Sequence, residues 1–537
     1  MRLEVDRERI FPWILLALTA SLYLTSLSGR DLWEPNEPTY AEATREMAAR
    51  GDWLLPTVNG EIYPDKPPLL FWGIGLASLP EGRVTETTAR IPSALAGMSL
   101  VLGIYFLSRR ILGPWGAFMS AAILAVSNLF VEQARYVQPD MLLSLGTGIG
   151  ILSLLRVVDG GAPRAGWVLI SAAGLALGIL AKGPVALALP VLVIAAGLVL
   201  ERRGFRQSGR LCLVGLLALS APALYYLDLV RRHGFAMMRE FILRSNIERF
   251  VAGFDNLEPW WFYLKHFPVD LVPMTFLLPA AAFFRPRDRE RRLAHRSFWV
   301  WLGVCLVFFS LSTSKRPVYL LPAFPAAALL CGSLLDGLTE WRPGRLVKRW
   351  VALGQGAALA LLGSAGIAAP FLARRQAPEL LRTALMLTLT GVAGCIIGFW
   401  QLVRERFIAV QAILVGAMAA LWLVSIFWVY PAANQFNSPR PFAEEIHRMV
   451  PSDAPLKTFG LYQWRAGYPF YARREMPRLS ETSGVERFLE SDKRVFCVVP
   501  EEGLASLKAN IPTPIYLLAE GRAGHRRDCL ISNRPPG

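Results

Sequence analysis

"WEPNEPTYAEATREMAARGDW" occupies residues 33–53, directly after the first long apolar run of the chain. Pro38 suits the first turn of a helix, because the N–H that proline lacks would have no partner there. Asn36 or Glu37 is then placed to cap this helix, and Gly51 to end it. Its apolar residues lean to one side and most of its charges lie elsewhere, so the helix could lie at a membrane interface; the plain alternative is an amphipathic connector.

The rest of the chain is predicted to supply membrane-spanning helices. Of its 537 residues, 53% are hydrophobic and only 18% are charged. The apolar residues come in repeated runs of roughly 17–24, each long enough to cross the hydrocarbon core of a bilayer. The sequence therefore predicts a polytopic α-helical membrane protein with thirteen spans, which begin near residues 11, 91, 114, 141, 167, 184, 211, 266, 297, 317, 350, 383 and 407.

The net charge of +16 does not indicate a nucleic-acid partner, because no basic stretch is interleaved with aromatic residues. The arginines instead occupy alternate loops, near residues 5, 110, 160, 205, 290, 345 and 405. This is the positive-inside pattern, which predicts that these loops and the N-terminus are cytoplasmic. Three longer polar segments, 28–90, 231–266 and the tail from about 431, are then external, and the chemistry is expected there.

The external tail, residues 431–537, is predicted to form a small α/β domain, in addition to a membrane domain of residues 1–430. Its strands are expected at "LKTFGLY", "KRVFCVVP", "PIYLLAE" and "DCLISN", and its helices at "PRPFAEEIHRMV", "GVERFLES" and "GLASLKANI". Cys497 and Cys529 lie in two of these strands, where either a disulfide or two buried thiols would fit. The cysteines show no metal-ligand spacing, so we predict no metal site.

A second motif follows the amphipathic helix, in "GEIYPDKPPLLFWG". Asp65 and Lys66 precede two prolines, which hold the backbone extended and fix where the acid and the amine point. A carboxylate can orient a hydroxyl or take its proton, and a lysine can bind phosphate. A plain alternative is that both side chains reach to water from the end of a span.

Residues 31–76, "DLWEPNEPTYAEATREMAARGDWLLPTVNGEIYPDKPPLLFWGIGL", resemble the first external loop of the GT-C glycosyltransferases related to protein O-mannosyltransferases. The resemblance is strongest to their aminoarabinose-transferase (ArnT-like) branch, which modifies lipid A. Further similar stretches are "RYVQPDMLLS" (135–144), "LAKGP" (180–184), "NIERF" (246–250) and "STSKRPVYLLPAFPAAALL" (312–330).

The resemblance implies that a sugar moves from a polyprenyl-phosphate (undecaprenyl-phosphate) donor to an envelope acceptor such as lipid A. The reaction would invert the anomeric configuration at the periplasmic face of a bacterial inner membrane. No cofactor besides the lipid-linked donor is implied, and whether the reaction requires a divalent metal ion stays open. Another glycolipid or a protein, as in protein O-mannosyltransferases, stays open as the acceptor. Two rival classes are a lipid or sugar transporter, which would place ionisable residues mid-span, and a scaffold whose tail binds a partner.

Such a reaction needs cations that stabilise the charge growing on the departing phosphate. Lys66, Arg249, Lys315 and Arg316 are predicted on the external face, against the positive-inside rule, and are our candidates for binding this phosphate. Snorkelling is the alternative for Lys315 and Arg316. Lys182, in "AKGP", could bind the donor or serve structure.

Candidate acids complete the predicted site. Asp140 follows a proline in "RYVQPDMLL" and is either a helix cap or an active-site residue that pairs with Arg135. The family pattern has a carboxylate where this chain has Asn36, and an arginine where it has Thr39. An amide cannot accept a proton at working pH. Glu37 or Asp65 could then act as the base, or an ionised phosphate acceptor could attack without one.

Overall fold

The computed structural model describes residues 2–158, 165–202, 208–253, 256–340, 344–462, 465–524 and 526–535. The predicted cytoplasmic loops near 160 and 205 therefore lie largely outside the described residues. The chain divides into two compact units. We call Met1–Thr25, Asp65–Leu69 and Ile91–Val429 the helical unit, and Ser26–Pro64, Leu70–Arg90 and Tyr430–Gly537 the mixed unit.

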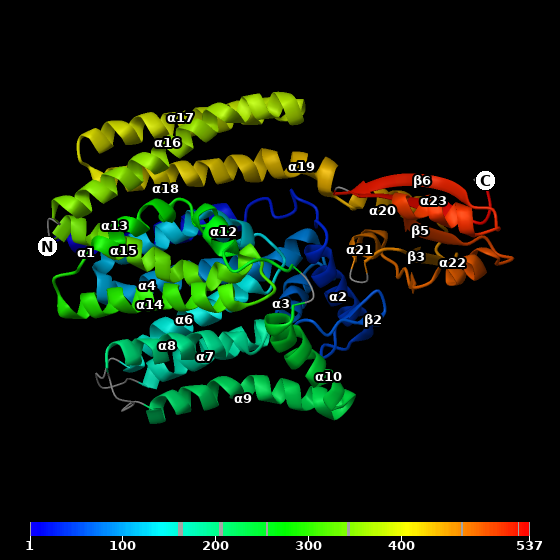
Figure 1. Ribbon diagram of the computed structural model, residues 1–537, viewed down its shortest axis with the longest axis horizontal. Helices are drawn as coiled ribbons and strands as arrows, with labels where there is room; N and C mark the ends of the chain where they lie inside the picture. The colour runs from blue at the N-terminus through cyan, green and yellow to red at the C-terminus, as the bar shows by residue number, and fades with distance from the viewer. Residues whose placement is uncertain are drawn as a thin grey trace. The chain divides into compact units, whose positions relative to one another are not determined.

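The helical unit consists of apolar helices joined by short connections (Figure 1). Its longer helices are α1 (Arg2–Tyr23), α4 (Glu86–Val126), α6 (Asp140–Val158), α7 (Ala165–Lys182), α8 (Val185–Leu200), α9 (Ser208–His233), α14 (Arg289–Leu311), α15 (Phe324–Glu340), α16 (Arg345–Gln376), α17 (Leu381–Val403) and α18 (Phe407–Val424). Its shorter helices are α5 (Asn128–Ala134), α10 (Phe235–Arg239), η1 (Glu240–Glu248), α11 (Arg249–Val251), α12 (Phe262–Asp270), η2 (Met274–Phe276), α13 (Leu278–Phe283), η3 (Pro317–Ala323), η4 (Pro378–Leu380) and η5 (Ser425–Val429).

Nine helices within the described residues are long and apolar enough to cross a membrane. The number becomes ten if α12 and the helices Met274–Phe283, which meet at a bend of 108°, form one broken span. The protein is therefore a multi-pass membrane protein, as predicted, but the count of thirteen is not confirmed. Two expected spans, near 91 and 114, share the 41-residue α4, which is interrupted at Gly113 by φ 76° and ψ 164°. α8, with 16 residues, is shorter than a typical span.

Glycines bring α6 and α7 into direct backbone contact. A Cβ added to Gly146 would lie 2.5 Å from the carbonyl oxygen of Gly174 and 2.6 Å from the amide nitrogen of Gly178. Small residues at such positions allow membrane helices to approach closely. The two helices follow one another in the chain and pack side by side, so the start of α6, at Asp140, meets the end of α7, at Lys182.

The mixed unit joins the first polar loop to the C-terminal tail. The loop supplies α2 (Asn36–Arg50), a small hairpin of β1 (Thr57–Val58) and β2 (Glu61–Ile62), and most of α3 (Leu69–Ser78). The tail supplies α19 (Tyr430–Asn437), α20 (Arg440–Met449), β3 (Leu456–Phe459), α21 (Gly467–Ala472), β4 (Arg478–Leu479), α22 (Thr482–Leu489), β5 (Phe496–Pro500), α23 (Glu501–Asn510), β6 (Tyr516–Ala523) and β7 (Arg526–Ser532).

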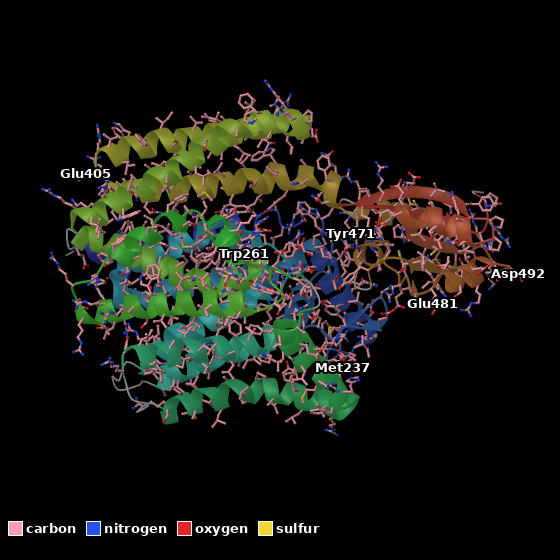
Figure 2. All side chains as sticks on the ribbon, viewed as in Figure 1. Met237, Trp261, Glu405, Tyr471, Glu481 and Asp492 are labelled. Carbon is pink, nitrogen blue, oxygen red and sulfur yellow. The ribbon has the colours of Figure 1, made fainter. Side chains whose placement is uncertain are left out.

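The tail forms the predicted α/β structure around one five-stranded sheet of order β4-β3-β5-β7-β6. β3 runs parallel to β4 and β5, and β7 runs antiparallel to β5 and β6. The four expected strands correspond to β3, β5, β6 and β7, and the three expected helices to α20, α22 and α23. Glu481 and Asp492, labelled in Figure 2, are exposed on this domain. Cys497 and Cys529 are buried free thiols.

Candidate active site

Asp65 and Lys66 form an ion pair directly before α3. The Lys66 ammonium lies 2.7 Å from Oδ2 of Asp65 and also donates to the Asp65 carbonyl at 3.0 Å. Arg249, the first residue of α11, reaches Oδ1 of the same carboxylate at 3.4 Å. Asp65 therefore holds two cations, its neighbour Lys66 and Arg249, which lies 184 residues after Asp65 in the chain.

Asp140 and Lys182 form a second ion pair where α6 and α7 meet. Asp140 is 1% exposed, and its Oδ2 accepts no hydrogen bond from the described residues. The Lys182 ammonium lies 4.5 Å from the centre of the Tyr319 ring, a cation–π contact. Within the described residues the partner of Asp140 is thus Lys182 and not Arg135, which donates to the Leu22 carbonyl at 2.8 Å.

The two ion pairs share one electrostatic environment. Burial lowers the pKa of the Lys66 ammonium, and Arg249 acts in the same direction, while Asp65 and Asp140 oppose them. Lys182 in turn experiences the positive charges of Lys66 and Arg316. We call Asp65, Lys66, Asp140, Lys182 and Arg249 the ion-pair cluster. It holds three cations and two carboxylates, so it carries a net positive charge that can attract an anion.

Lys315 and Arg316 differ in their surroundings although they are adjacent. The Lys315 ammonium donates to the carbonyl oxygens of Glu258, at 2.8 Å, and of Ser312. Arg316 influences Lys182 electrostatically, and its carbonyl accepts a hydrogen bond of 3.1 Å from the Tyr263 hydroxyl. The structure thus brings Arg316 to the ion-pair cluster, whereas Lys315 caps the backbone at the end of α14.

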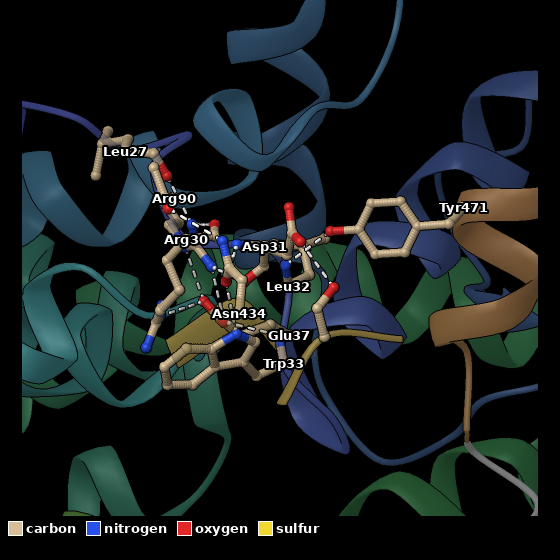
Figure 3. A network of polar contacts seen from close by, with 11 residues as sticks. Leu27, Arg30, Asp31, Leu32, Trp33, Glu37, Arg90, Asn434 and Tyr471 are labelled. Carbon is tan, nitrogen blue, oxygen red and sulfur yellow. Dashed lines mark hydrogen bonds and ion pairs between the residues drawn. The ribbon is translucent and has the colours of Figure 1, made fainter. Parts of the chain in front are cut away.

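Glu37 belongs to the mixed unit and lies in a network of buried charges (Figure 3). Its Oε1 is 2.9 Å from Arg30 Nη2 and from Arg90 Nε, and its Oε2 is 2.8 Å from Arg90 Nη2. Oε2 also accepts from the Trp33 amide at 3.2 Å. Burial by itself would raise the pKa of Glu37, but Arg30 and Arg90 outweigh it and hold the pKa below its usual range. Glu37 is 0% exposed, so its carboxylate is a structural anion in this conformation.

Arg30 and Arg90 were not among our candidates, although the sequence carries a signal for them. Both lie in the loop that is predicted to be external, where the positive-inside rule disfavours cations, as it does for Lys66. Arg90 is 1% exposed and also donates to the carbonyls of Leu27 and Asp31. Tyr319 was not a candidate either, because nothing in its spacing indicates the ring contact with Lys182.

The loop around Glu37 is fixed by residues of the tail. The Asp31 amide donates to Asn434 Oδ1 at 3.0 Å, and the Leu32 amide donates to the Tyr471 hydroxyl at 2.8 Å (Figure 3). The Ser438 hydroxyl donates to the Asp31 carboxylate at 2.7 Å. The polar loop and the tail are therefore one folded unit rather than two separate segments.

The start of α2 differs from the prediction. The helix begins at Asn36, its N-cap is Pro35, and no side chain caps it, so neither Asn36 nor Glu37 is the cap. Gly51 ends the helix in the left-handed conformation, φ 69°, as predicted. Asn36 is half-buried in the first turn.

Glu34 is a second carboxylate that the fold encloses. Its Oε1 accepts a hydrogen bond of 2.7 Å from the Gly467 amide, and its buried Oε2 has no partner among the described residues. Burial raises the pKa of Glu34 to about 7, against the opposing effect of Arg465. Across the described ranges we find no group of three His, Cys, Asp or Glu residues that could hold a metal ion.

Comparisons with known proteins relate the chain to a family. Residues 65–226 match the family model described as dolichyl-phosphate-mannose-protein mannosyltransferase. An undecaprenyl phosphate-alpha-4-amino-4-deoxy-L-arabinose arabinosyl transferase of Pseudomonas fluorescens is 30% identical over 84% of this chain and 79% of its own length. One from Pseudomonas aeruginosa is 35% identical over 60% of this chain and 59% of its own length.

A solved structure has the same fold. ArnT from Cupriavidus metallidurans, crystallised with undecaprenyl phosphate, matches 97% of both chains with a TM-score of 0.79 at 21% identity. The relative from Pseudomonas fluorescens extends the similarity across both units of the chain. The protein is a GT-C membrane glycosyltransferase and belongs to the family of the ArnT-like aminoarabinose transferases.

Proposed function

We propose that this protein transfers 4-amino-4-deoxy-L-arabinose from undecaprenyl phosphate to lipid A. The proposal rests on the ion-pair cluster, whose three cations come from a loop, from α7 and from α11 of one unit. The family membership supports the donor, because the relatives from Pseudomonas are named for an undecaprenyl phosphate sugar. The acceptor in this proposal is lipid A.

Lys66, Lys182 and Arg249 bind the donor phosphate in this proposal, and Arg316 adds positive charge. As the bond between sugar and phosphate breaks, negative charge grows on the phosphate oxygens, and nearby cations in a dry site stabilise it strongly. Lys66 is 8% exposed, which supports such a site. Asp140 Oδ2, buried and without a hydrogen bond from the described residues, can accept one from a hydroxyl or the amine of the sugar.

The acceptor attacks without a general base. Asp65 is paired with both Lys66 and Arg249, so its carboxylate orients these cations instead of taking a proton. Glu37 is buried between two arginines, and Asn36 cannot take a proton. A phosphate group of the acceptor is already ionised at neutral pH, so it attacks the anomeric carbon directly and inverts its configuration.

The site faces the periplasm in this proposal, with the N-terminus in the cytoplasm and the domain of residues 431–537 outside. Arginine-rich loops at the other ends of the spans support this orientation in a bacterial inner membrane. The polyprenyl tail of the donor accounts for a catalytic site built at the ends of membrane helices.

The experiment uses the purified full chain with undecaprenyl phosphate-linked aminoarabinose and lipid A, and detects the product by mass spectrometry. We expect the wild type to add one aminoarabinose to lipid A, and Lys66→Gln to lower turnover at least about 10²-fold, as is usual when one preorganised donor is lost from such a site. Lys493→Gln, which changes an exposed lysine of the tail, is the matched control. Wild-type protein that binds the donor but transfers no sugar, or a fully active Lys66→Gln, would refute the proposal.

A further inference from the structure

The mixed unit contains a groove of about 600 Å³, and none of the residues that line it belongs to the ion-pair cluster. α2, α3, the start of α4, α20 and the end of α21 form its walls. We call it the arginine groove, after Arg45, Arg83, Arg440 and Arg473, which line it together with Trp53 and Tyr471 (Tyr471 is labelled in Figure 2). Its volume lies within the usual range for sites that bind small ligands.

Two of the four arginines are neutralised by the protein. Arg45 forms a bidentate contact with the buried Glu42, at 2.7 and 2.6 Å. Arg440 pairs with Glu444 at 2.7 Å, and with Asp31 and Glu86 at 3.5 Å each. These two arginines are held in place by carboxylates, which compensate their charge.

Arg83 and Arg473 keep their positive charge available. Both are exposed, and within the described ranges neither forms an ion pair. Arg473 has a left-handed backbone, φ 56°, which places it as the residue that ends α21. Two uncompensated guanidinium groups on one groove favour an anion that accepts several hydrogen bonds, and phosphate is the group that arginine binds best in this way.

The remaining wall of the groove is apolar and open. Leu79 is 71% exposed, and the Trp53 ring packs against Gly75, where an added Cβ would lie 2.4 Å from the ring. The Trp72 indole donates to the Trp53 carbonyl at 2.8 Å and fixes this turn. From Thr85 the chain continues directly into α4, a helix apolar enough to span a membrane. A soluble phosphate ion would make no favourable contact with this apolar wall. A lipid has both an anionic headgroup for the arginines and an apolar part for the wall.

We propose that the arginine groove binds the phosphorylated headgroup of a glycolipid, with Arg83 and Arg473 on the phosphate and Trp53 and Leu79 against the apolar portion. This inference rests on the proposed function in one respect: the bound lipid is the acceptor. The binding itself does not depend on whether sugar is transferred.

The test measures binding of lipid A, and of the same lipid after phosphatase treatment, to the full chain in detergent by native mass spectrometry. We expect wild type to prefer the phosphorylated form, and Arg83→Gln with Arg473→Gln to weaken its binding about tenfold for each arginine. Ala49→Trp, at an exposed position of α2 on the groove, should weaken binding by filling the space without a change of charge. Arg478→Gln with Arg487→Gln removes two exposed arginines elsewhere in the same unit and is the matched control.

Several outcomes would overturn the groove proposal. They are unchanged lipid A binding by the double variant, an equal loss in the control, an equal loss of undecaprenyl phosphate binding, and full displacement of the lipid by millimolar inorganic phosphate. Wild-type protein that binds lipid A through the groove but transfers no sugar would refute the proposed function and leave the groove standing. If the wild type transfers sugar but the double variant binds lipid A as tightly as the wild type does, the groove proposal alone is refuted.

Discussion

Replacing Glu37 by glutamine separates a structural role for this residue from a catalytic one. The amide has the shape of the carboxylate and can still accept a hydrogen bond from the Trp33 amide, but it carries no charge. Arg30 and Arg90, 6% and 1% exposed, would then be buried without their shared anion. Removing one partner of a buried ion pair destabilises proteins by about 3–5 kcal/mol.

We expect a loss near 3 kcal/mol, because the amide oxygen keeps part of the hydrogen bonding and Arg90 retains its contacts with the Leu27 and Asp31 carbonyls. For a large chain this corresponds to a melting temperature lower by about 5 °C. Tryptophan fluorescence of the detergent-solubilised protein during heating measures it. Glu490→Gln, at an exposed carboxylate of the tail, is the control and should melt like the wild type.

Turnover is measured on the same samples, well below the lower melting temperature. If Glu37 is structural, activity per folded molecule should fall less than tenfold, whereas loss of a general base typically lowers the rate by 10²-fold or more. A variant that melts like the wild type but has lost 10²-fold in rate would refute the reasoning and make Glu37 the base.

Three further predictions follow from the contacts. Lys315→Met leaves the carbonyls of Glu258 and Ser312 without the hydrogen-bond donor that Lys315 supplies, so it should lower the melting temperature. Undecaprenyl phosphate should bind to this variant as tightly as to the wild type. A tenfold weaker affinity would instead show that Lys315 binds the phosphate. Asn36→Asp restores the carboxylate of the family pattern. If the reaction needs no general base, turnover of this variant in a product assay should rise less than twofold. A tenfold rise would contradict the mechanism without a base. Burial raises the pKa of Glu34 to about 7, so the folded state holds this proton more tightly than the unfolded state, and stability should fall as pH rises from about 4.5 to 7. Melting temperatures at pH 5 and pH 8 should therefore differ more for the wild type than for Glu34→Gln, and equal differences would contradict the assignment.

The membrane fold could be predicted from the sequence because hydrophobic length alone decides it. Runs of apolar residues and the arginine-rich loops between them indicated the spans, and strand and helix patterns indicated the domain at the C-terminus. The number of spans was harder to predict, because Gly113 lets two runs continue as one interrupted helix and α12 meets the next helices at a sharp bend.

The sequence indicated which residues form the candidate site, but not which of them pair with one another. Asp65 and Lys66 are neighbours in the chain, so their contact follows from the sequence. The pair of Asp140 and Lys182 depends on how α6 packs on α7, and the sequence suggested Arg135 instead. Glu37 was a reasonable base until its partners were known, since Arg90 lies 53 residues away and becomes its neighbour only in the folded loop.

The direct contact of α6 and α7 has a genetic consequence. Gly146 is six residues from Asp140, and Gly178 is four residues from Lys182, distances of about 9 Å and 6 Å along the helices. A single added methyl group in this seam must push the two backbones apart and so part the acid from the amine, although it touches neither. A selection for inactive mutants should therefore recover alanine or serine at the glycines of this seam, Gly146, Gly174 and Gly178.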